Sequence, residues 1–304
     1  MPTRIRIPVG HADETFRALG SAVRIVVTAP EAAVLLRRAR AELRNFEACA
    51  SRFQAGSELC ALNADRRAVV PASRMLRDAV RAALWAGHRS DGLVDPCLLD
   101  ALEAAGYRGS FRPAGPVSPA CGPARAARPD PAARWRQVRV DDDRGTIERP
   151  PGLRLDLGGS GKGHATDRLA RLLHPVARSW VVDAGGDVRV GGVQEVAVAH
   201  PLEQQPVARL RIADGAVATS SIVRRAWRTA DGRTAHHLLD PATGEPVQTG
   251  LLAVTALAPT ALEAETLSKM ALLAGPAGAR RVLARRGGVA IHAGGDVERI
   301  GAAA

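Results

Sequence analysis

Residues 155–167 carry the side chains and the backbone flexibility that an anion-binding site needs. Four glycines lie there around Lys162, between the carboxylates Asp156 and Asp167. Glycine lets a backbone approach a ligand closely, and the free N–H groups at a helix start attract negative charge. Lys162 is one of only two lysines in the chain, which indicates that a compact ammonium is needed here. The segment predicts a phosphate site at a strand-to-helix turn, and the alternative is a glycine-rich turn without a ligand.

Two common nucleotide-binding motifs do not fit this segment. A P-loop has Ser or Thr after its lysine and glycine six positions before it, whereas this chain has Gly163 and Asp156. A Rossmann fingerprint would need a glycine where His164 stands. The predicted anion site therefore belongs to neither class.

A second segment whose residues could bind a ligand is a short acidic turn. Asp183 and Asp187 flank Gly185 and Gly186, so two carboxylates border a stretch of backbone without side chains. Such a stretch can lie against a ligand, and the alternative is a hairpin turn formed by its aspartates.

A third segment contains two adjacent histidines, His236 and His237, shortly before Asp240. A histidine near a carboxylate can act as a general acid or base. Neighbouring side chains on a strand point to opposite faces, so we expect only one of the two to reach a site. The alternative is a half-buried strand that ends in an Asp-Pro turn.

The elements that would position these residues are short strands and amphipathic helices. Strands are predicted at 22–28, 180–183, 187–190, 195–198, 207–212, 251–257 and, as the last one, 289–292. Helices are predicted at 34–46, from 73 to about 87, at 164–177, 260–274 and from 276 to before 287. Hairpin-linked strands with few helices predict an α+β fold, a largely antiparallel sheet flanked by helices, rather than a doubly wound one. We expect a single domain over 1–304. Residues 108–134 should form a surface loop or insertion, because their apolar residues follow neither the helical nor the strand periodicity.

Composition excludes several classes of protein. The 304 residues are 46% hydrophobic, which allows a full core. The net charge of +11 is spread along the chain and aromatic residues make up 3%, so we expect no nucleic-acid partner. No run of apolar residues is long enough for a transmembrane anchor and the start does not resemble a signal peptide, so we expect a cytoplasmic protein. The four cysteines form no CxxC pair, and we expect buried thiols.

The order of the motifs resembles the ApbE family, the FAD:protein FMN transferases. The most specific matching segments are 156–163 with Asp167, 183–187, 218–220 and 237–244. Weaker matches follow the family's order at 16–21, 51–59 with Asn63, 91–96 and 258–265. The resemblance covers nearly the whole chain.

The resemblance implies an α+β fold that holds FAD in a cleft between two halves. It also implies an activity, the transfer of FMN from FAD to a Ser or Thr of an acceptor protein in a phosphodiester bond, with release of AMP. Two alternatives remain open: hydrolysis of FAD to FMN and AMP, and an FAD-binding protein without catalysis.

The resemblance also assigns roles to individual residues. The expected catalytic residues are His237, Asp240 and Lys162. The expected FAD-binding residues are Leu19, Asn63, Asp91, Asp95, Gly158, Gly159, Gly161, Lys162, Asp183, Gly185, Gly186, Ser220, His237 and Lys269.

The chain departs from the family's pattern at the metal site. The resemblance implies Mg²⁺ at the FAD pyrophosphate, with Gly161 and Glu265 as ligands. Glu265 stands where the family usually has Asp, and Lys269 stands where it usually has Thr. We therefore expect the Lys269 ammonium to lie near the pyrophosphate and to take over part of the role of the cation. The alternative is an ion pair between Glu265 and Lys269 on a helix, worth only ~0.2–0.5 kcal/mol.

A second departure follows the strand segment 218–220. Many family members have Gly-Asp after its Thr-Ser pair, whereas this chain continues with Ser221 and Ile222. The contacts that the family's Gly-Asp pair would make near Ser220 are therefore not expected in this chain.

Overall fold

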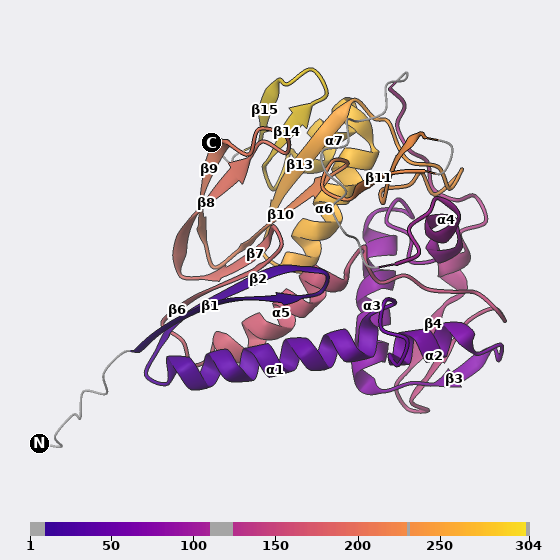
Figure 1. The fold of residues 1–304 in the computed structure, drawn as a ribbon, viewed down its shortest axis with the longest axis horizontal. Helices are drawn as coiled ribbons and strands as arrows, with labels where there is room; N and C mark the ends of the chain where they lie inside the picture. Colours follow the sequence, from indigo (N-terminus) through magenta and orange to yellow (C-terminus); the bar gives the residue numbers. More distant parts are fainter. Residues whose placement is uncertain (1–9, 110–123, 230–231, 302–304) are drawn as a thin grey trace, which may run out of the picture.

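The computed structural model describes residues 10–109, 124–229 and 232–301. Its centre is an eight-stranded sheet in which every neighbouring pair is antiparallel (Figure 1). The strand order is β1 (Gly10–Ala18), β2 (Ser21–Ala29), β6 (Ser179–Ala184), β7 (Asp187–Gly191), β10 (Ala216–Ser221), β13 (Leu251–Ala258), β14 (Gly288–His292) and β15 (Val297–Ile300). The predicted α+β class with a largely antiparallel sheet is confirmed.

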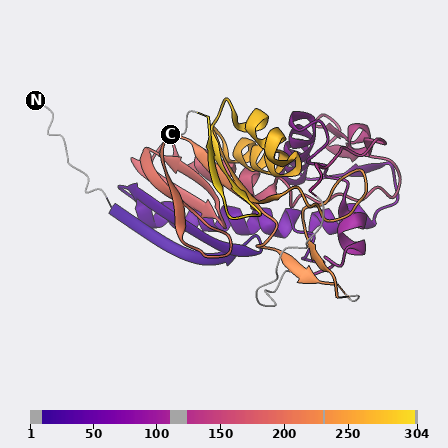
Figure 2. The same cartoon turned by 90° about the horizontal axis from the view of Figure 1, so that it is seen from above.

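Three helices pack against this sheet and bury its apolar side chains: α1 (Ala32–Ala50), α5 (Gly161–Leu173) and α6 (Ala261–Leu273). β2 contributes Val23, Ile25 and Val27, all fully buried, to the core beneath α1 and α5. Alternate residues of β2 face that core, as the period of two in a strand requires. Figure 2 shows α1 running along the sheet.

The other face of the sheet is covered by a hairpin of β8 (Val193–Ala199) and β9 (Pro206–Ala213). Val198, Leu210 and Ile212 of this hairpin form a separate core with Val188 and Val217 of the central sheet. The central strands are therefore buried on both faces, which explains why β13 reads as a nearly continuous apolar run.

The remaining elements form a lobe beside the sheet (Figure 1). They are α2 (Glu58–Ala64), α3 (Arg74–Arg89), α4 (Leu99–Ala104), the 3₁₀ turn η1 (Arg134–Gln137) and a small sheet of β3 (Val69–Pro71), β4 (Arg139–Asp141) and β5 (Thr146–Glu148). Three short elements complete the fold on the C-terminal side: the paired strands β11 (Ala226–Arg228) and β12 (Thr234–His236), and helix α7 (Gly275–Leu283). Buried Arg149 joins the small sheet to α2, because its guanidinium donates to the carbonyl oxygens of Leu62 and Asp65 at the end of that helix.

The structure differs from the sequence-based expectations in several elements and in one helix start. The predicted strand 289–292 is not the last one, since β15 follows it, and β1 was not predicted. The predicted helix 164–177 begins three residues earlier, at Gly161, so two of the glycines lie in the first turn of α5 rather than before it. Glycine disfavours a helix interior, and the packing of α5 overrides that preference.

The predicted surface loop 108–134 lies partly outside the described residues. Of its described residues, 108–109 and 124–134, the stretch 124–133 lies against the C-terminal side of the molecule. Arg125 donates its N–H to the carbonyl of Gln248, and Ala127 donates to that of Leu273. Within the described ranges, none of the helices combines the length and the apolar composition that a membrane crossing needs.

Candidate functional site

The glycine-rich segment enters the site along an extended backbone that Asn63 holds in place. The Asn63 amide donates to the carbonyl of Leu155 and accepts from its N–H, both at 2.8 Å. Beyond it, Asp156 accepts the N–H of Gly158 at 2.6 Å and pairs with Arg52 at 2.5 Å. Both side chains of this ion pair are more than nine-tenths buried. The pair therefore fixes the bend that leads into α5.

Gly163 and Asp167 join α5 to the start of α6. A Cβ on Gly163 would lie 2.6 Å from the carbonyl oxygen of Ala261, so only glycine allows the two helices to approach this closely. The Asp167 carboxylate accepts the free N–H groups of Ala261 and Leu262 at 2.9 and 3.0 Å. These two motif residues therefore position α6, which carries Glu265 and Lys269.

Both lysines of the chain meet at one buried carboxylate, Glu265, which is fully buried. Lys269 donates to Glu265 Oε1 at 2.8 Å, and the ammonium of Lys162 lies 3.8 Å from the same oxygen. Lys162 also pairs with buried Asp187. Burial opposes the charge on Lys162, but attraction by Asp187 and Glu265 outweighs it and raises the pKa of that lysine. Lys162 therefore stays protonated.

The residues expected to bind Mg²⁺ do not fit a divalent cation. Glu265 Oε1 accepts from Lys269, and its Oε2 accepts the N–H of Gly163 at 2.8 Å, so both carboxylate oxygens are engaged. A protonated lysine at the position of a ligand offers no lone pair and repels a cation. Among the described residues, no group of three or more His, Cys, Asp and Glu side chains is placed to hold a metal. Gly161 adds only a backbone group at the start of α5.

The two adjacent histidines occupy different surroundings. His236 is bonded on both ring nitrogens within the fold, to the carbonyl of Val247 at 2.9 Å and to the N–H of Leu238 at 3.3 Å. His237 instead lines a cavity, and its buried Nδ1 has no partner among the described residues. Burial and the nearby Arg225 guanidinium lower the pKa of His237 well below its usual value. His237 is therefore a neutral imidazole at physiological pH, the form that can accept a proton.

Among the described residues, Asp240 makes no hydrogen bond or ion pair with His237. Its Oδ1 accepts the backbone N–H groups of Arg128 at 2.9 Å and Ala242 at 3.0 Å. These bonds close the turn after β12 and hold residues 124–133 against it. The contacts give Asp240 a structural role in positioning the histidine segment.

The cavity beside His237 has a volume of about 90 Å³. Five of the predicted FAD-binding residues line it: Asp95, Gly158, Gly159, His237 and Lys269. Asp95 is mostly buried, and burial raises the pKa of its carboxyl group. Apolar side chains from the segments around 93–102, 238–239 and 273 complete the walls.

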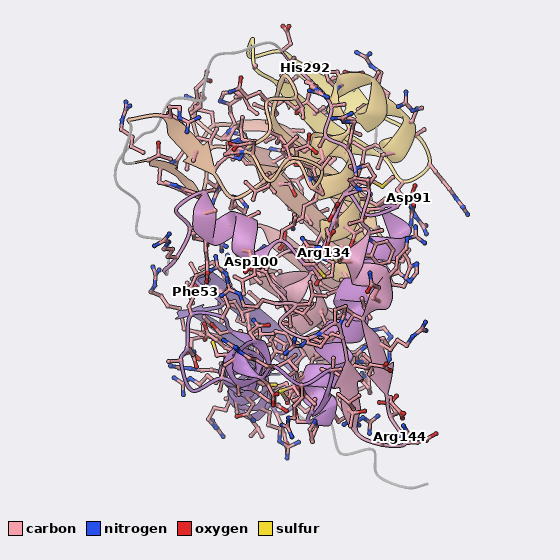
Figure 3. The ribbon with its side chains drawn as sticks, turned by 90° about the vertical axis from the view of Figure 1, so that its right-hand side faces the viewer. Phe53, Asp91, Asp100, Arg134, Arg144 and His292 are labelled. Carbon is pink, nitrogen blue, oxygen red and sulfur yellow. The ribbon has the colours of Figure 1, made fainter. Side chains whose placement is uncertain are left out.

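Other predicted site residues lie outside the cavity wall. Asp91 is 87% exposed and pairs with Arg136 on the surface, where Figure 3 labels it. Buried Ser220 shares a hydrogen bond with Ser268 at 2.9 Å, between β10 and α6. Leu19 lies in the turn between β1 and β2 and donates its N–H to Glu47 at 2.8 Å. That turn nevertheless adjoins the site, because a Cβ on Gly20 would lie 3.8 Å from the Arg225 guanidinium.

The predicted acidic turn joins β6 to β7, next to the lysine pair. Asp183 accepts the N–H of Gly186 at 2.8 Å, and Gly185 and Gly186 have positive φ angles of 73° and 101°. A Cβ on Gly185 would also lie 2.7 Å from the Ser21 side chain, so glycine is required there. This geometry directs Asp187 to Lys162.

Sequence reasoning missed a cluster of rings and guanidinium groups that lies at the same cavity. This aromatic cluster consists of Phe53, Tyr107 and Trp227 with Arg52 and Arg225. The Arg52 guanidinium lies 4.1 Å from the ring centroid of Phe53 and 4.5 Å from that of Tyr107. Tyr107 stacks on Trp227 with centroids 5.3 Å apart, and its hydroxyl accepts from Arg225 at 3.3 Å.

The rings of this cluster belong to a residue class that is scarce in the chain. The chain has one tyrosine, four phenylalanines and four tryptophans. Two of these nine rings, Phe53 and Tyr107, line the cavity that Lys269 and His237 also line, and Trp227 stacks on Tyr107. Aromatic side chains are enriched where a flat ligand binds, so their convergence is a signal for such a site.

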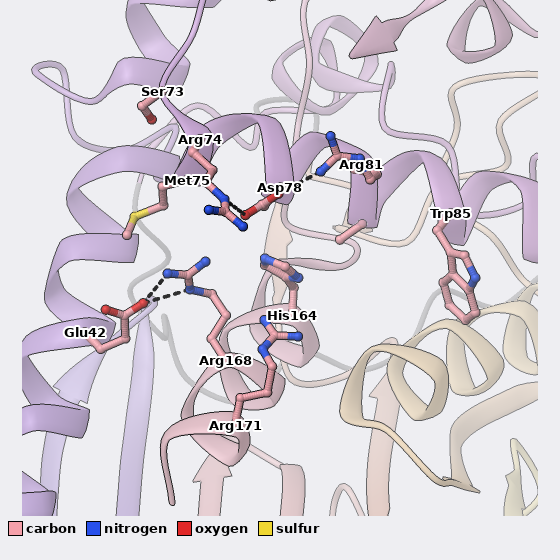
Figure 4. A pocket seen from close by; sticks show the side chains of 11 residues that line it. Glu42, Ser73, Arg74, Met75, Asp78, Arg81, Trp85, His164, Arg168 and Arg171 are labelled. Carbon is pink, nitrogen blue, oxygen red and sulfur yellow. Dashed lines mark hydrogen bonds and ion pairs between the residues drawn. The ribbon is translucent and has the colours of Figure 1, made fainter. Parts of the chain in front are cut away.

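A larger cavity, of about 1010 Å³, lies elsewhere, between α1, α3 and α5 (Figure 4). Its walls carry arginines and His164, and they include none of the predicted site residues. The convergence of Lys269, His237 and the glycine-rich backbone therefore assigns the candidate active site to the smaller cavity, although the other is larger.

Known proteins resemble the chain over most of its length. A profile of the ApbE family matches residues 19–293. The FAD:protein FMN transferase of Salmonella typhimurium is 28% identical over 275 residues, which span 86% of this chain and 77% of that protein. The FAD:protein FMN transferase of Escherichia coli is 28% identical over 232 residues, which span 73% of this chain and 65% of that protein.

Solved structures show the same fold. The ApbE protein of Thermotoga maritima superposes with a TM-score of 0.80 at 25% identity, covering 96% of this chain and 97% of that one. The apo flavinyl transferase ApbE of Pseudomonas stutzeri superposes with a TM-score of 0.76 at 22% identity, covering 96% and 95%. Profile, sequence and fold agree, and the chain belongs to the ApbE family.

Proposed function

We propose that this chain transfers the FMN part of FAD to a Ser or Thr hydroxyl of an acceptor protein. The hydroxyl oxygen attacks the phosphorus of the FMN part and forms a new P–O bond. The P–O bond to the AMP part breaks, AMP leaves, and the hydroxyl proton passes to a base. One observation carries the proposal most directly: neutral His237 lies in the same cavity as the cations Lys269 and Arg225.

His237 is the base that we assign to the acceptor hydroxyl. Its ring is neutral because burial and Arg225 lower its pKa. Its Nδ1 has no partner among the described residues, so one nitrogen is not committed to the fold. A buried neutral imidazole can take the proton as the new bond to phosphorus forms.

The cations supply the charge that the diphosphate of FAD needs. Lys269 and Arg225 line the cavity, and the Lys162 ammonium lies 3.8 Å from Glu265, the partner of Lys269. Gly158 and Gly159 add a backbone that a phosphate can approach closely. These groups can stabilise the negative charge of the transferred phosphoryl group and of the leaving AMP.

We further propose that Lys269 performs the role that the family assigns to Mg²⁺. The support is that Glu265 has both oxygens engaged and that the ammonium already stands beside it. An ammonium neutralises a phosphate without a metal, although it gives up the polarising power of a divalent ion. FAD binding measured by quenching of flavin fluorescence should therefore be equally tight with and without a chelator.

The aromatic cluster is suited to a flavin or adenine ring. The cavity of about 90 Å³ is smaller than a dinucleotide requires, since ligand sites usually occupy at least ~300 Å³. Side chains of the cluster must therefore move when FAD enters.

The direct test is incubation of the protein with FAD and an acceptor peptide of the type Asp/Ser-Gly-x-Ser/Thr-x-Thr, which the family resemblance implies. Mass spectrometry should show FMN on the peptide and an equal amount of AMP. AMP release with an unmodified peptide would point to FAD hydrolysis instead. Stoichiometric FAD binding without either product would show a protein that has lost catalysis.

A further inference from the structure

The large cavity between α1, α3 and α5 lies on the side of α5 that faces away from Lys162. His164, Arg168 and Arg171 line it, and their spacing of four and three residues places them in one stripe along the helix. Lys162 precedes His164 by two residues, which corresponds to roughly the opposite side of a helix. The cavity is therefore separate from the candidate active site.

The cavity has an excess of positive charge. Arg168 is paired with Glu42, and Arg81 is paired with Asp78 at 2.7 Å, as the dashed lines in Figure 4 show. Arg171 differs from them, because no carboxylate of the described residues lies within ion-pair distance of its guanidinium. An uncompensated arginine beside a pocket of about 1010 Å³ is available to a ligand anion.

A buried imidazole without a partner lies beside Arg171. His164 is only 8% exposed, and its Nε2 has no hydrogen-bond partner among the described residues. Its ring packs against Phe46 with centroids 5.7 Å apart. Burial, together with the charges of Arg168 and Arg171, lowers the pKa of His164 to about 4. Buried polar atoms normally have partners, so this nitrogen is open to a hydrogen bond from a water or from a ligand.

The far end of the cavity offers a ring to stack on. Trp85 lines it and is 40% exposed, so its ring is accessible to a ligand in the cavity. Asp78 is close enough to His164 to affect the pKa of its imidazole. On α3, Asp78 precedes Trp85 by seven residues. Seven residues correspond to about 10 Å along a helix. A charged end and an aromatic end are thus separated by about the length of one small ligand.

We propose that this cavity binds a phosphomonoester of the nucleotide type, with its phosphate at Arg171 and His164 and its base against Trp85. A guanidinium matches the geometry of two phosphate oxygens, and an imidazole N–H can donate to a third. Base stacking on an aromatic side chain tolerates different bases. The proposal does not depend on the function proposed for the smaller cavity.

The test is titration calorimetry of the full chain with AMP, inorganic phosphate and adenosine, in the presence of excess FAD to fill the other site. AMP should bind more tightly than phosphate, and adenosine should bind least. Arg171→Glu should lower the affinities for AMP and for phosphate by about tenfold or more, because it removes a charge-assisted hydrogen bond. Arg299→Glu makes the same charge change on β15 and should leave both affinities unchanged.

Two further variants separate the parts of the site. Trp85→Ala should weaken the binding of AMP but not that of phosphate. His164→Phe should weaken the binding of both, while the new ring still packs against Phe46. AMP binding that FAD abolishes, or that Arg171→Glu leaves unchanged, overturns the proposal. Equal losses in Arg171→Glu and Arg299→Glu also overturn it, since net charge alone would then explain the binding. If FAD does not bind at all, the Arg171 comparison still decides the question.

Discussion

At the scale of single residues, the site is organised by one buried carboxylate. Glu265 accepts from Lys269 and from the N–H of Gly163, and Lys162 lies nearby. A buried carboxylate is stable only when it is paired in this way. The same pairing removes the oxygens that a metal would need and holds an ammonium at the cavity. We propose that this exchange of a metal for a lysine is the chemical feature that distinguishes the site.

His237 provides a test at this scale. We expect His237→Ala to slow single-turnover FMN transfer by a factor of about a hundred or more, because the base is lost. Its lowered pKa keeps the imidazole neutral, so the wild-type rate should not fall through its protonation between about pH 8 and about pH 6. His236→Ala should reduce stability, since both ring nitrogens are bonded within the fold, and should change the rate little. The opposite order of the two rates would contradict the assignment.

Sequence reasoning could identify residues by type but not by the partner that each one takes. It pointed to Lys269, Glu265 and His237, whose spacing and rarity are visible in the chain. Asn63 and Asp240 have equally suitable side chains, yet the structure uses both to bind backbone groups. A polar side chain can bind a ligand or a peptide group equally well, and only packing decides between them.

At the scale of elements, the crossing of α5 and α6 places the lysines. Gly163 allows the approach, and Asp167 binds the start of α6. The helices themselves were predicted from apolar periodicity and from start and stop signals. In the structure the Thr260 hydroxyl caps α6 by accepting a hydrogen bond from the N–H of Glu263. Their contact could not be predicted, because it joins segments that are about a hundred residues apart in the chain.

Two glycines in the first turn of α5 give a matched test of this contact. Gly163→Ala should destabilise the fold by about 1–3 kcal/mol, because its Cβ would meet the Ala261 carbonyl at 2.6 Å. Gly161→Ala meets nothing within 4 Å and should be neutral or stabilising by up to about 1 kcal/mol. Urea denaturation measures both changes. Equal effects of the two substitutions would mean that the helix crossing does not depend on Gly163.

At the scale of the whole molecule, an antiparallel sheet whose central strands are buried on both faces supports one helical layer and a lateral lobe. The α+β class followed from hairpin-linked strands. The aromatic cluster could not be predicted, because Arg52, Tyr107 and Arg225 come from three distant segments. Such contacts depend on how the lobe packs against the strands near β11, which local sequence patterns do not encode.

Burial of neutral histidines should make the fold sensitive to acid. The pKa values of His164 and His236 are lowered from 6.5 to about 4, so the unfolded chain binds more protons between these values. The stability that these histidines contribute is present above pH 6.5 and is lost as the pH falls toward about 4, by an amount on the order of a few kcal/mol. His164→Phe should show a weaker loss over this range than the wild type, and exposed His174→Gln should show the same loss as the wild type. A pH dependence that His164→Phe does not change would contradict the lowered pKa of His164.

The dependence of FMN transfer on metal tests the whole account most directly. Single-turnover transfer from FAD to the acceptor peptide would be followed by covalent flavin fluorescence, with a chelator or with Mg²⁺, for the wild type and for Lys269→Thr. We expect the wild type to transfer FMN equally well under both conditions, because Lys269 supplies the positive charge. Lys269→Thr should be slow with the chelator, and Mg²⁺ should accelerate it. A wild type that the chelator inactivates completely, with Lys269→Thr behaving identically, would contradict the replacement of the metal by the lysine.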